Sequence, residues 1–275
     1  MELKLSGGRS VSTDLPAFVM GIVNATPDSF WKESRGGLGR ALSLVEDGAD
    51  IIDVGGESTR PGSGYISDDE EIRRVVPVVE ALRRVSSVPI SIDTRKLSVM
   101  KAAFEAGADI LNDVSALEDE PLLADFAAEK NIPVILMHKR GIPSTMQDDT
   151  SYRNAFAEVD SYLSARCAFA ESRGIAPENI IVDPGIGFGK DDRANFSLIS
   201  RCGELCGGRY RILMALSRKS CIGRVTGRDE GGRLAGTLTA DAVAVMSGAS
   251  MVRVHDVAEA VDSLKVLAAL GFGGR

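Results

Sequence analysis

The stretch Ile180-Ile-Val-Asp-Pro184 is a short, β-rich apolar run that stops on a polar residue. The same pattern occurs eight times, at residues 17–24, 51–57, 89–94, 110–115, 133–138, 180–184, 211–217 and 251–256. The intervals between the runs are irregular, so the pattern is architectural and not a tandem sequence repeat. Strands and helices alternating in this number predict a parallel (β/α)8 TIM barrel of the α/β class, with a doubly wound open sheet as the competing architecture.

The segments between the runs have helical character. Helices are expected near residues 36–48, 68–84, 96–106, 119–129, 151–173, 191–205, 232–247 and 256–270. The second begins with acids and ends with arginines, which suits the helix dipole, and Pro77 inside it predicts a kink. Residues 2–12 alternate around a Gly-Gly turn, which predicts an N-terminal β-hairpin closing the bottom of the barrel.

Length and composition limit the choices further. A chain of 275 residues fits one barrel, so residues 1–275 are predicted to form a single domain. With 32 basic and 39 acidic side chains, the net charge of −7 argues against a nucleic-acid partner. Charges near the N-terminus interrupt any secretion signal, and no run approaches the roughly 20 apolar residues of a membrane span. We therefore expect a cytoplasmic chain with no membrane partner.

The four cysteines are at positions 167, 202, 206 and 221. Their spacing is not that of a zinc site, and no histidine lies near the pair at 202 and 206 in the sequence. We expect all four to be reduced thiols.

The carboxyl ends of all strands in such a barrel open on one face, so the polar residues that end the runs should converge there. The candidates are Asn24, Glu57, Asp93, Asn112, His138, Asp183, Ser217 with Lys219, and Arg253 with His255. Asp93, Asn112 and Asp183 suit a ring rich in hydrogen-bond donors and acceptors. Lys219, Arg253 and His255 suit an anion, and they follow the last two strands, where barrels often bind phosphate. A planar heterocycle bearing a phosphate fits both halves.

Each candidate also has a structural interpretation when taken alone. Asp93 and Asp183 could be carboxylates satisfied by neighbouring backbone, Arg218 could be a solvated turn charge, and a strand-end histidine is often only hydrogen-bonded. Eight polar strand ends together are harder to explain in this way, because barrel interiors favour branched apolar residues.

The glycine-rich stretch Asp183-Pro-Gly-Ile-Gly-Phe-Gly-Lys190 has neither the Rossmann nor the Walker spacing, so it does not indicate a dinucleotide or a nucleoside triphosphate. Its glycines suit a tight loop that lets the backbone approach a ligand, or simply a turn from strand to helix.

Taken in order, eight motifs resemble those of the dihydropteroate synthases, folate-pathway enzymes of the pterin-binding family. They lie at residues 20–30, 53–62, 91–94, 112–115, 137–141, 183–190, 217–220 and 253–257, and so cover nearly the whole chain. The ordered set is highly specific, whereas Ser217-Arg-Lys219 alone is not. The resemblance implies condensation of 6-hydroxymethyl-7,8-dihydropterin diphosphate with p-aminobenzoate, giving 7,8-dihydropteroate and pyrophosphate. The implied mechanism is dissociative: diphosphate leaves first, and the arylamine captures the resulting cation.

The resemblance also implies roles for individual residues. The implied pterin-binding residues are Asp93, Asn112, Asp183 and Lys219; the diphosphate-binding residues are Asn24, Arg253 and His255; the p-aminobenzoate and loop residues are Phe30, Thr59, Arg60, Pro61, Phe188 and Ser220; and the catalytic residues are Asp93, Lys219, Arg253 and His255. Asn24 would contact a Mg²⁺ ion that bridges to the phosphates. The family further implies a homodimer, to which the apolar final helix at 258–270 would contribute, and competition by sulfonamides at the p-aminobenzoate pocket.

Three stretches depart from the family pattern. Residues 31–37 replace a stretch that usually holds an aspartate, Met214-Ala-Leu216 adds bulk beside the ring site, and Ala25 follows Asn24 where valine is usual. Two other functions are compatible with the same ring site. One is that of a corrinoid-dependent methyltransferase that uses methyltetrahydrofolate, and the other is that of a non-catalytic pterin-binding protein. A Schiff-base aldolase using Lys219 is a weaker alternative, because Arg218 beside it suits anions.

Overall fold

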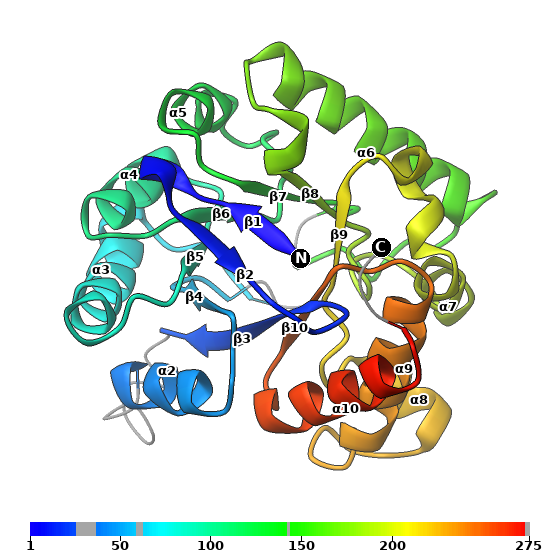
Figure 1. The fold of residues 1–275 in the computed structure, drawn as a ribbon. Coiled ribbons are helices and arrows are strands. Elements are labelled where there is room, and N and C mark those ends of the chain that lie inside the picture. The colour runs from blue at the N-terminus through cyan, green and yellow to red at the C-terminus, as the bar shows by residue number, and fades with distance from the viewer. Residues whose placement is uncertain (26–36, 59–62, 142–143, 273–275) are drawn as a thin grey trace.

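A computed structural model of the chain describes residues 1–25, 37–58, 63–141 and 144–272. Its main element is a ring of eight strands surrounded by helices (Figure 1). The ring closes in the order β10-β3-β4-β5-β6-β7-β8-β9, and all neighbouring strands in it are parallel. The predicted (β/α)8 barrel is therefore confirmed, and the open sheet is excluded.

The strands correspond to the eight apolar runs. They are β3 Phe18–Asn24, β4 Ile51–Gly55, β5 Ile90–Asp93, β6 Ile110–Asp113, β7 Val134–Met137, β8 Ile180–Asp183, β9 Arg211–Met214 and β10 Met251–Val254. The α-helices are α2 Gly37–Glu46, α3 Asp68–Val85, α4 Leu97–Glu105, α5 Leu122–Lys130, α6 Ala155–Ser172, α7 Asp192–Ser200, α8 Ser220–Thr226, α9 Leu234–Met246 and α10 Val257–Ala269. Two short 3₁₀ segments are η2 Pro177–Asn179 and η3 Cys202–Gly208.

Two helices differ from their predicted form. Helix α3 continues as one α-helix through Pro77, with Ser67 as its N-cap accepting a hydrogen bond from the Glu70 N–H at 3.3 Å. The helix predicted at 191–205 ends at Ser200, and the chain continues as η3, where Cys206 has a left-handed φ of 51°. The backbone there leaves the α-helical region, which a periodicity pattern does not reveal.

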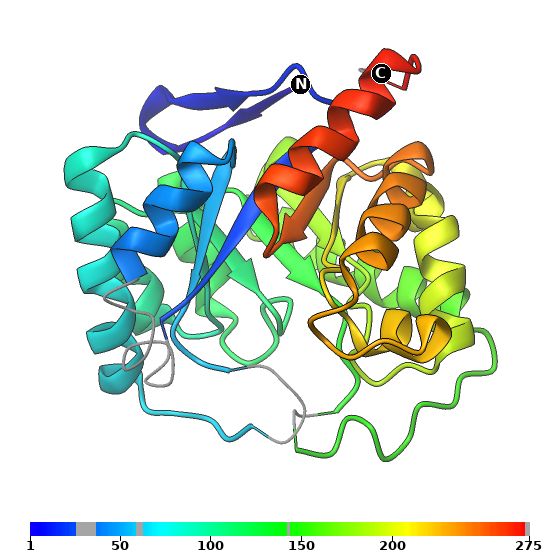
Figure 2. The same cartoon turned by 90° about the horizontal axis from the view of Figure 1, so that it is seen from below.

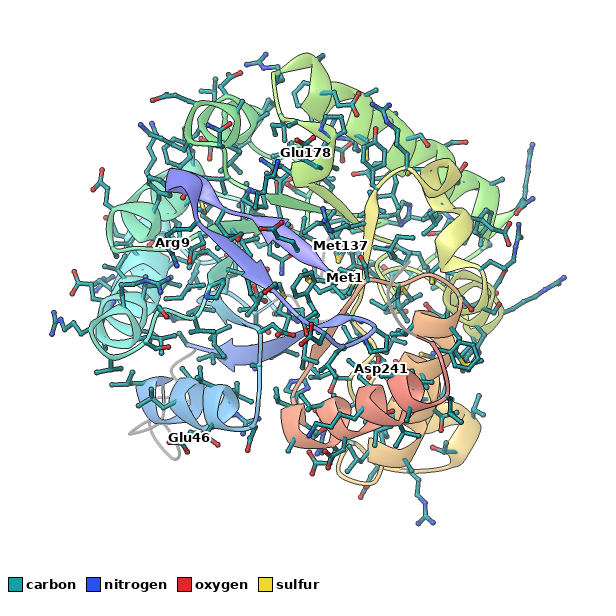
Figure 3. The ribbon with its side chains drawn as sticks, viewed as in Figure 1. Met1, Arg9, Glu46, Met137, Glu178 and Asp241 are labelled. Atoms are coloured by element: carbon teal, nitrogen blue, oxygen red, sulfur yellow. The ribbon has the colours of Figure 1, made fainter. Side chains whose placement is uncertain are left out.

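The predicted N-terminal hairpin closes one end of the barrel. Strands β1 (Glu2–Lys4) and β2 (Ser10–Ser12) pair antiparallel through the 3₁₀ turn η1 (Ser6–Gly8), and the hairpin lies across the top of Figure 2. Met1 lies over the middle of the ring and Arg9 near its edge (Figure 3). The Arg9 guanidinium is 2.6 Å from Asp109 Oδ1, so an ion pair holds the hairpin to the loop before β6.

Alternate residues of each strand face the barrel interior, and this sorts the core into two clusters. The inner cluster lies beneath the hairpin and consists of Leu3, Leu5, Phe18, Met20, Ile51, Ile110, Ile135, Ile181, Leu213 and Met251. The larger, outer cluster fills the layer between the strands and the helices. The interior of the barrel near the hairpin is therefore mostly apolar. Arg211 is an exception, since it shares the inward face of β9 with Leu213 and donates to the Glu2 carbonyl oxygen of the hairpin.

All four cysteines are free thiols, as expected, and three of them are buried. No helix in the described residues is both long enough and apolar enough to cross a lipid bilayer.

Candidate active site

A layer of polar side chains covers the inner apolar cluster at the carboxyl ends of the strands. On four strands an inward-facing apolar residue is followed two positions later by a polar one, so both point the same way. These pairs are Ile51 and Asp53, Ile110 and Asn112, Ile181 and Asp183, and Met251 and Arg253. Asp93, paired with Asn112 in the register of β5 and β6, belongs to the same layer. The structure thus brings together the predicted residues Asp93, Asn112, Asp183 and Arg253.

Arg253 is bound to two carboxylates within this layer. Its Nε is 2.7 Å from Asp53 Oδ2, and its Nη2 is 3.0 Å from Asp93 Oδ2. Asn112 Nδ2 lies 3.3 Å from the same Asp53 oxygen. The sequence analysis placed Arg253 with the anion site and Asp93 with the ring site, and the structure shows the two in direct contact.

Asp53 is a site residue that the sequence analysis did not select. It is fully buried, and it holds both Arg253 and Asn112. The candidate predicted from this run is Glu57, its last polar residue. The alternation of Ile51, Asp53 and Gly55 would have identified Asp53, because these three share one face of β4.

The charges of this cluster set unusual pKa values. Burial raises the pKa of Asp93 to about 7, since the favourable charge of Arg253 only partly offsets desolvation and the Asp53 carboxylate adds to the rise. Burial lowers the pKa of Arg253, but the carboxylates of Asp53 and Asp93 outweigh it, and the net shift is upward. Near neutral pH, Arg253 is therefore a cation, and Asp93 holds its proton to a higher pH than an exposed aspartate does.

Asp183 and Lys219 form the next part of the layer. Asp183 Oδ1 accepts a hydrogen bond from the Gly185 N–H at 2.7 Å, and burial raises the pKa of this carboxyl group. Burial also lowers the pKa of Lys219 to about 8, although the Asp183 carboxylate opposes this shift. The Lys219 ammonium is 4.5 Å from the centre of the Phe188 ring. Lys219 therefore carries a charge at neutral pH and lies between a carboxylate and an aromatic face.

The loop after β8 is built around a buried lysine. Lys190 Nζ lies 2.9 Å from the Gly185 carbonyl oxygen, 3.1 Å from that of Phe188 and 2.8 Å from His138 Nδ1. Gly185 has a φ of 65°, and a Cβ there would be 1.9 Å from the His138 carbonyl oxygen, so only glycine fits. Lys190 is not among the residues predicted from the sequence, because its partner His138 is 52 residues away.

His138, a candidate from its position at a strand end, is not in the polar layer as a reactive group. It is buried, its ring meets the Tyr162 ring edge to face at 4.9 Å, and Lys190 is bound to its Nδ1. Burial and the charge of Lys190 lower the pKa of His138 to about 3. His138 is therefore a neutral hydrogen-bond acceptor with a structural role.

Ser217 and His255 face each other across the ends of β9 and β10. The Ser217 hydroxyl accepts from the His255 backbone N–H at 3.1 Å, and its oxygen is 2.9 Å from His255 Nδ1. Asn24 is the exposed last residue of β3, and Ser220 is the exposed first residue of α8. These positions place both side chains at the mouth of the barrel.

Glu57 is compensated by two cations. Its carboxylate is 3.2 Å from Arg95 Nε and 3.1 Å from Lys96 Nζ. It also borders a shallow pocket on the same face of the barrel. The pocket is lined by Glu57, Tyr65, Arg95, Val114, Lys139, Gly141, Met146 and Phe188.

Four predicted site residues, Phe30, Thr59, Arg60 and Pro61, lie outside the described residues, as do positions 31–36 of the altered first loop. Within the part of the chain that is described, no group of three or more His, Cys, Asp or Glu side chains forms a potential metal site. A divalent cation at this mouth would therefore depend on ligands other than an acidic protein cage.

Comparisons with known proteins agree with this geometry. Residues 20–255 match the model of a family described as pterin binding enzyme. The dihydropteroate synthase of Escherichia coli K12 is 44% identical over 259 residues, covering 91% of this chain and 90% of that protein. The structure of Xanthomonas albilineans dihydropteroate synthase with 4-aminobenzoic acid superposes with a TM-score of 0.91 at 41% identity, covering 98% of this chain and 99% of that one. A structure of the Xanthomonas albilineans enzyme with 7,8-dihydropteroate gives 0.86 at 38% identity, covering 98% of each chain.

Proposed function

This chain belongs to the pterin-binding enzyme family, and from that premise we infer that it is a dihydropteroate synthase. It condenses 6-hydroxymethyl-7,8-dihydropterin diphosphate with p-aminobenzoate, giving 7,8-dihydropteroate and pyrophosphate, and is thus a transferase of folate biosynthesis. The observation that carries this conclusion is the polar layer, in which ring-binding groups and cations meet above an apolar floor. Neither the corrinoid methyltransferase nor the non-catalytic alternative is favoured by the comparisons.

We propose that Asp93, Asn112, Asp183 and Lys219 bind the pterin. One oxygen of Asp183 is already bound to the Gly185 N–H, and the other can accept from the amino and ring N–H groups of a pterin. Lys219 beside it can donate to the ring carbonyl. Because hydrogen bonds to charged groups contribute about 1.5–3 kcal/mol, losing Asp183 should weaken binding more than a surface change does.

We assign the diphosphate to Asn24, Arg253 and His255. The bonds to Asp53 and Asp93 use two of the N–H donors of Arg253, and a guanidinium has five, so others can donate to phosphate oxygens. If the Ser217 hydroxyl donates to Nδ1 of His255, the hydrogen of the neutral ring is on Nε2, which then is a donor to an anion. In this arrangement His255 binds charge and takes no proton from the amine.

Mg²⁺ is part of the proposal. The Asn24 amide oxygen is a suitable ligand for this ion, and phosphate and water oxygens would complete its coordination. Bound there, the ion would neutralise charge on the leaving diphosphate. The absence of an acidic cage among the described residues fits this donor set, since Mg²⁺ commonly keeps few protein ligands.

The reaction is proposed to be dissociative. Diphosphate leaves the methylene carbon with the bonding electrons, and the positive charge that develops spreads into the pterin beside Asp93. The ionised Asp93 stabilises that charge, and Arg253 holds the carboxylate in place at 3.0 Å. The amine of p-aminobenzoate then attacks the carbon and loses a proton to solvent. Lys219 binds the pterin part, and Arg253 binds the diphosphate before and after the bond between the two parts breaks.

For p-aminobenzoate we propose a slot formed by Phe188 and Ser220 together with Phe30, Thr59, Arg60 and Pro61, which lie outside the described residues. Ser220 begins α8, where a backbone N–H can bind the carboxylate. Sulfonamides, which mimic this substrate, are expected to compete at the slot.

We also propose a cytoplasmic homodimer. Exposed apolar side chains occur on two neighbouring helices, with Val243 and Met246 on α9 and Val266 on α10, and Leu270 directly follows α10. Such side chains gathered on adjacent elements are typical of an interface. Sedimentation should give a dimer at micromolar concentration, and Val266→Glu should weaken it while Leu122→Glu on α5 should not. A wild-type chain that is entirely monomeric would remove this part of the proposal.

The central experiment measures pyrophosphate release with both substrates and Mg²⁺. Asp183→Ala and Lys219→Ala should each lower kcat/KM by about tenfold or more. The matched controls are Asp125→Ala and Lys265→Ala, whose side chains are exposed and pair with other surface residues. If the two site variants turn over as fast as the controls, the assignment of the site is wrong; if the wild type releases no pyrophosphate, the function is wrong.

A further inference from the structure

The two strands that carry the cations of the site are poorly joined where they reach it. β10 pairs with β3 over four positions, as far as Val254 opposite Gly21. Its register with β9 covers only two, and ends at Val252 opposite Met214. Residues 215–219 and 253–256 therefore lie beyond the part of β9 and β10 in which the two strands pair with each other. The distance between these two segments depends on side-chain contacts.

Two side-chain contacts join these segments in place of backbone hydrogen bonds between β9 and β10. The first is the contact between Ser217 and His255. The second is a two-point ion pair, in which Arg218 Nη2 is 2.8 Å from Asp256 Oδ1 and Arg218 Nε is 3.0 Å from Asp256 Oδ2. The Arg218 and Asp256 side chains are only 26% and 19% exposed, so solvent screens the pair less than it would at the surface. Arg218 is thus not the solvated turn charge that the sequence allowed.

The backbone of Arg218 is held in a conformation that an arginine does not favour. Its φ of 57° lies in the left-handed region, which costs a non-glycine residue about 1 kcal/mol or more. The Thr237 hydroxyl accepts from its N–H at 3.1 Å, and Arg233 Nη1 donates to its carbonyl at 2.9 Å. This turn sends the Arg218 side chain to Asp256, while Lys219, the next residue, lies over Phe188 in the site.

We propose that Arg218 and Asp256 are a positioning pair that sets the distance between the ends of β9 and β10, and so aligns Lys219 with Arg253 and His255. The proposal rests on the proposed function, in which Lys219 binds the pterin and the β10 residues bind the diphosphate of one molecule. Two half-sites bind a linked ligand tightly only when their separation matches it, because a misplaced pair must be strained into register. The ion pair supplies that match without touching the substrate.

The test distinguishes the alignment of the two half-sites from the affinity of each half-site for its own part of the substrate. Calorimetry would measure the Kd of 6-hydroxymethyl-7,8-dihydropterin alone, of inorganic pyrophosphate with Mg²⁺, and of the intact diphosphate, for the wild type and for Asp256→Asn. The expected result is a change below about twofold for each fragment and a loss of about tenfold or more for the intact substrate. Asp256→Glu, which keeps the charge, should recover part of the loss. A purely structural role would not distinguish the linked ligand from its fragments.

A second variant and a matched control complete the design. Arg218→Gly keeps the left-handed backbone accessible while removing the guanidinium, and should behave like Asp256→Asn. Asp192→Asn removes a similar two-point contact, at 3.0 and 2.9 Å to Arg224 Nε, between α7 and α8, and should change none of the three affinities. The positioning role alone is overturned if Asp256→Asn binds the intact substrate with the Kd of the wild type. It is also overturned if either fragment loses as much affinity as the intact substrate does. A wild type that fails to bind the diphosphate overturns the proposed function together with it.

Discussion

Asp241 on α9 allows a direct test of how burial acts on an unpaired acid. Its side chain is 3% exposed, and within the described structure neither carboxyl oxygen has a hydrogen-bond partner (Figure 3 marks its position). Burial raises its pKa well above the usual value, and no ion pair or hydrogen bond opposes the shift. The folded protein therefore keeps a proton on Asp241 that the unfolded chain loses above about pH 4.

The size of this effect on stability follows from the pKa of an aspartate in the unfolded chain. Each pH unit above about 3.9 over which the folded state keeps this acid protonated costs about 1.36 kcal/mol. Because the folded state binds the extra proton, this contribution lowers stability as pH rises, and the fall ends at the folded pKa. Asn at the same position does not ionise. The free energy of unfolding of Asp241→Asn minus that of the wild type should thus increase with pH, by up to about 1.4 kcal/mol per pH unit while the folded wild type keeps its proton.

Equilibrium urea unfolding followed by circular dichroism, from about pH 5 to about pH 8, measures this difference. Subtracting the wild type removes the titration of groups common to both chains. Asp262→Asn on α10 is the control, because that aspartate is exposed and pairs with Lys265, and its difference from the wild type should stay nearly constant. A stability difference for Asp241→Asn that does not change with pH would refute the reasoning.

Three further outcomes test the polar layer and the loop beside it. Asp53→Asn keeps the side-chain volume but removes the charge bound to Arg253, so kcat/KM for pyrophosphate release should fall by about tenfold or more, and an unchanged value would exclude Asp53 from the site. Lys190→Met leaves backbone carbonyls without their donor, and urea unfolding should show a loss of about 3 kcal/mol; a midpoint equal to that of the wild type would contradict this role. Gly185→Ala should prevent soluble expression, because its Cβ would meet a carbonyl oxygen at 1.9 Å, whereas Gly207→Ala, with a φ of 64° and open space, should express; equal yields would be inconsistent with the steric argument.

The barrel could be predicted from the sequence because its signal is local. Each strand is an apolar run, and the polar residue that ends the run marks the carboxyl end. Parallel strands bring those ends to one face, so Asp93, Asn112, Asp183 and Arg253 could be grouped before any coordinates. That residues 1–275 form one domain stays a prediction, for which a single cooperative unfolding transition is the test.

The errors and omissions in the site concern contacts between distant segments. The sequence left both a reactive and a structural interpretation open for His138, and Lys190, 52 residues later, makes it a structural acceptor. From the sequence alone, Arg218 could be a solvated charge in a turn. The structure shows that it pairs with Asp256, 38 residues later. Asp53 was visible in the alternation of β4, yet its importance comes from Arg253 across the barrel. Sequence patterns show which way a side chain points, whereas partners across the barrel require the closed ring.

The hairpin and the inner apolar cluster have a chemical consequence. With Leu3 and Leu5 packed against Phe18 and Met20, most of the base of the barrel is filled by apolar side chains. In the proposed mechanism, a carbocation beside Asp93 would therefore meet water chiefly at the polar mouth, which the arylamine itself must occupy. Hydrolysis of the intermediate and its productive capture therefore compete for one entrance, and the order in which the two substrates arrive decides how much diphosphate is wasted.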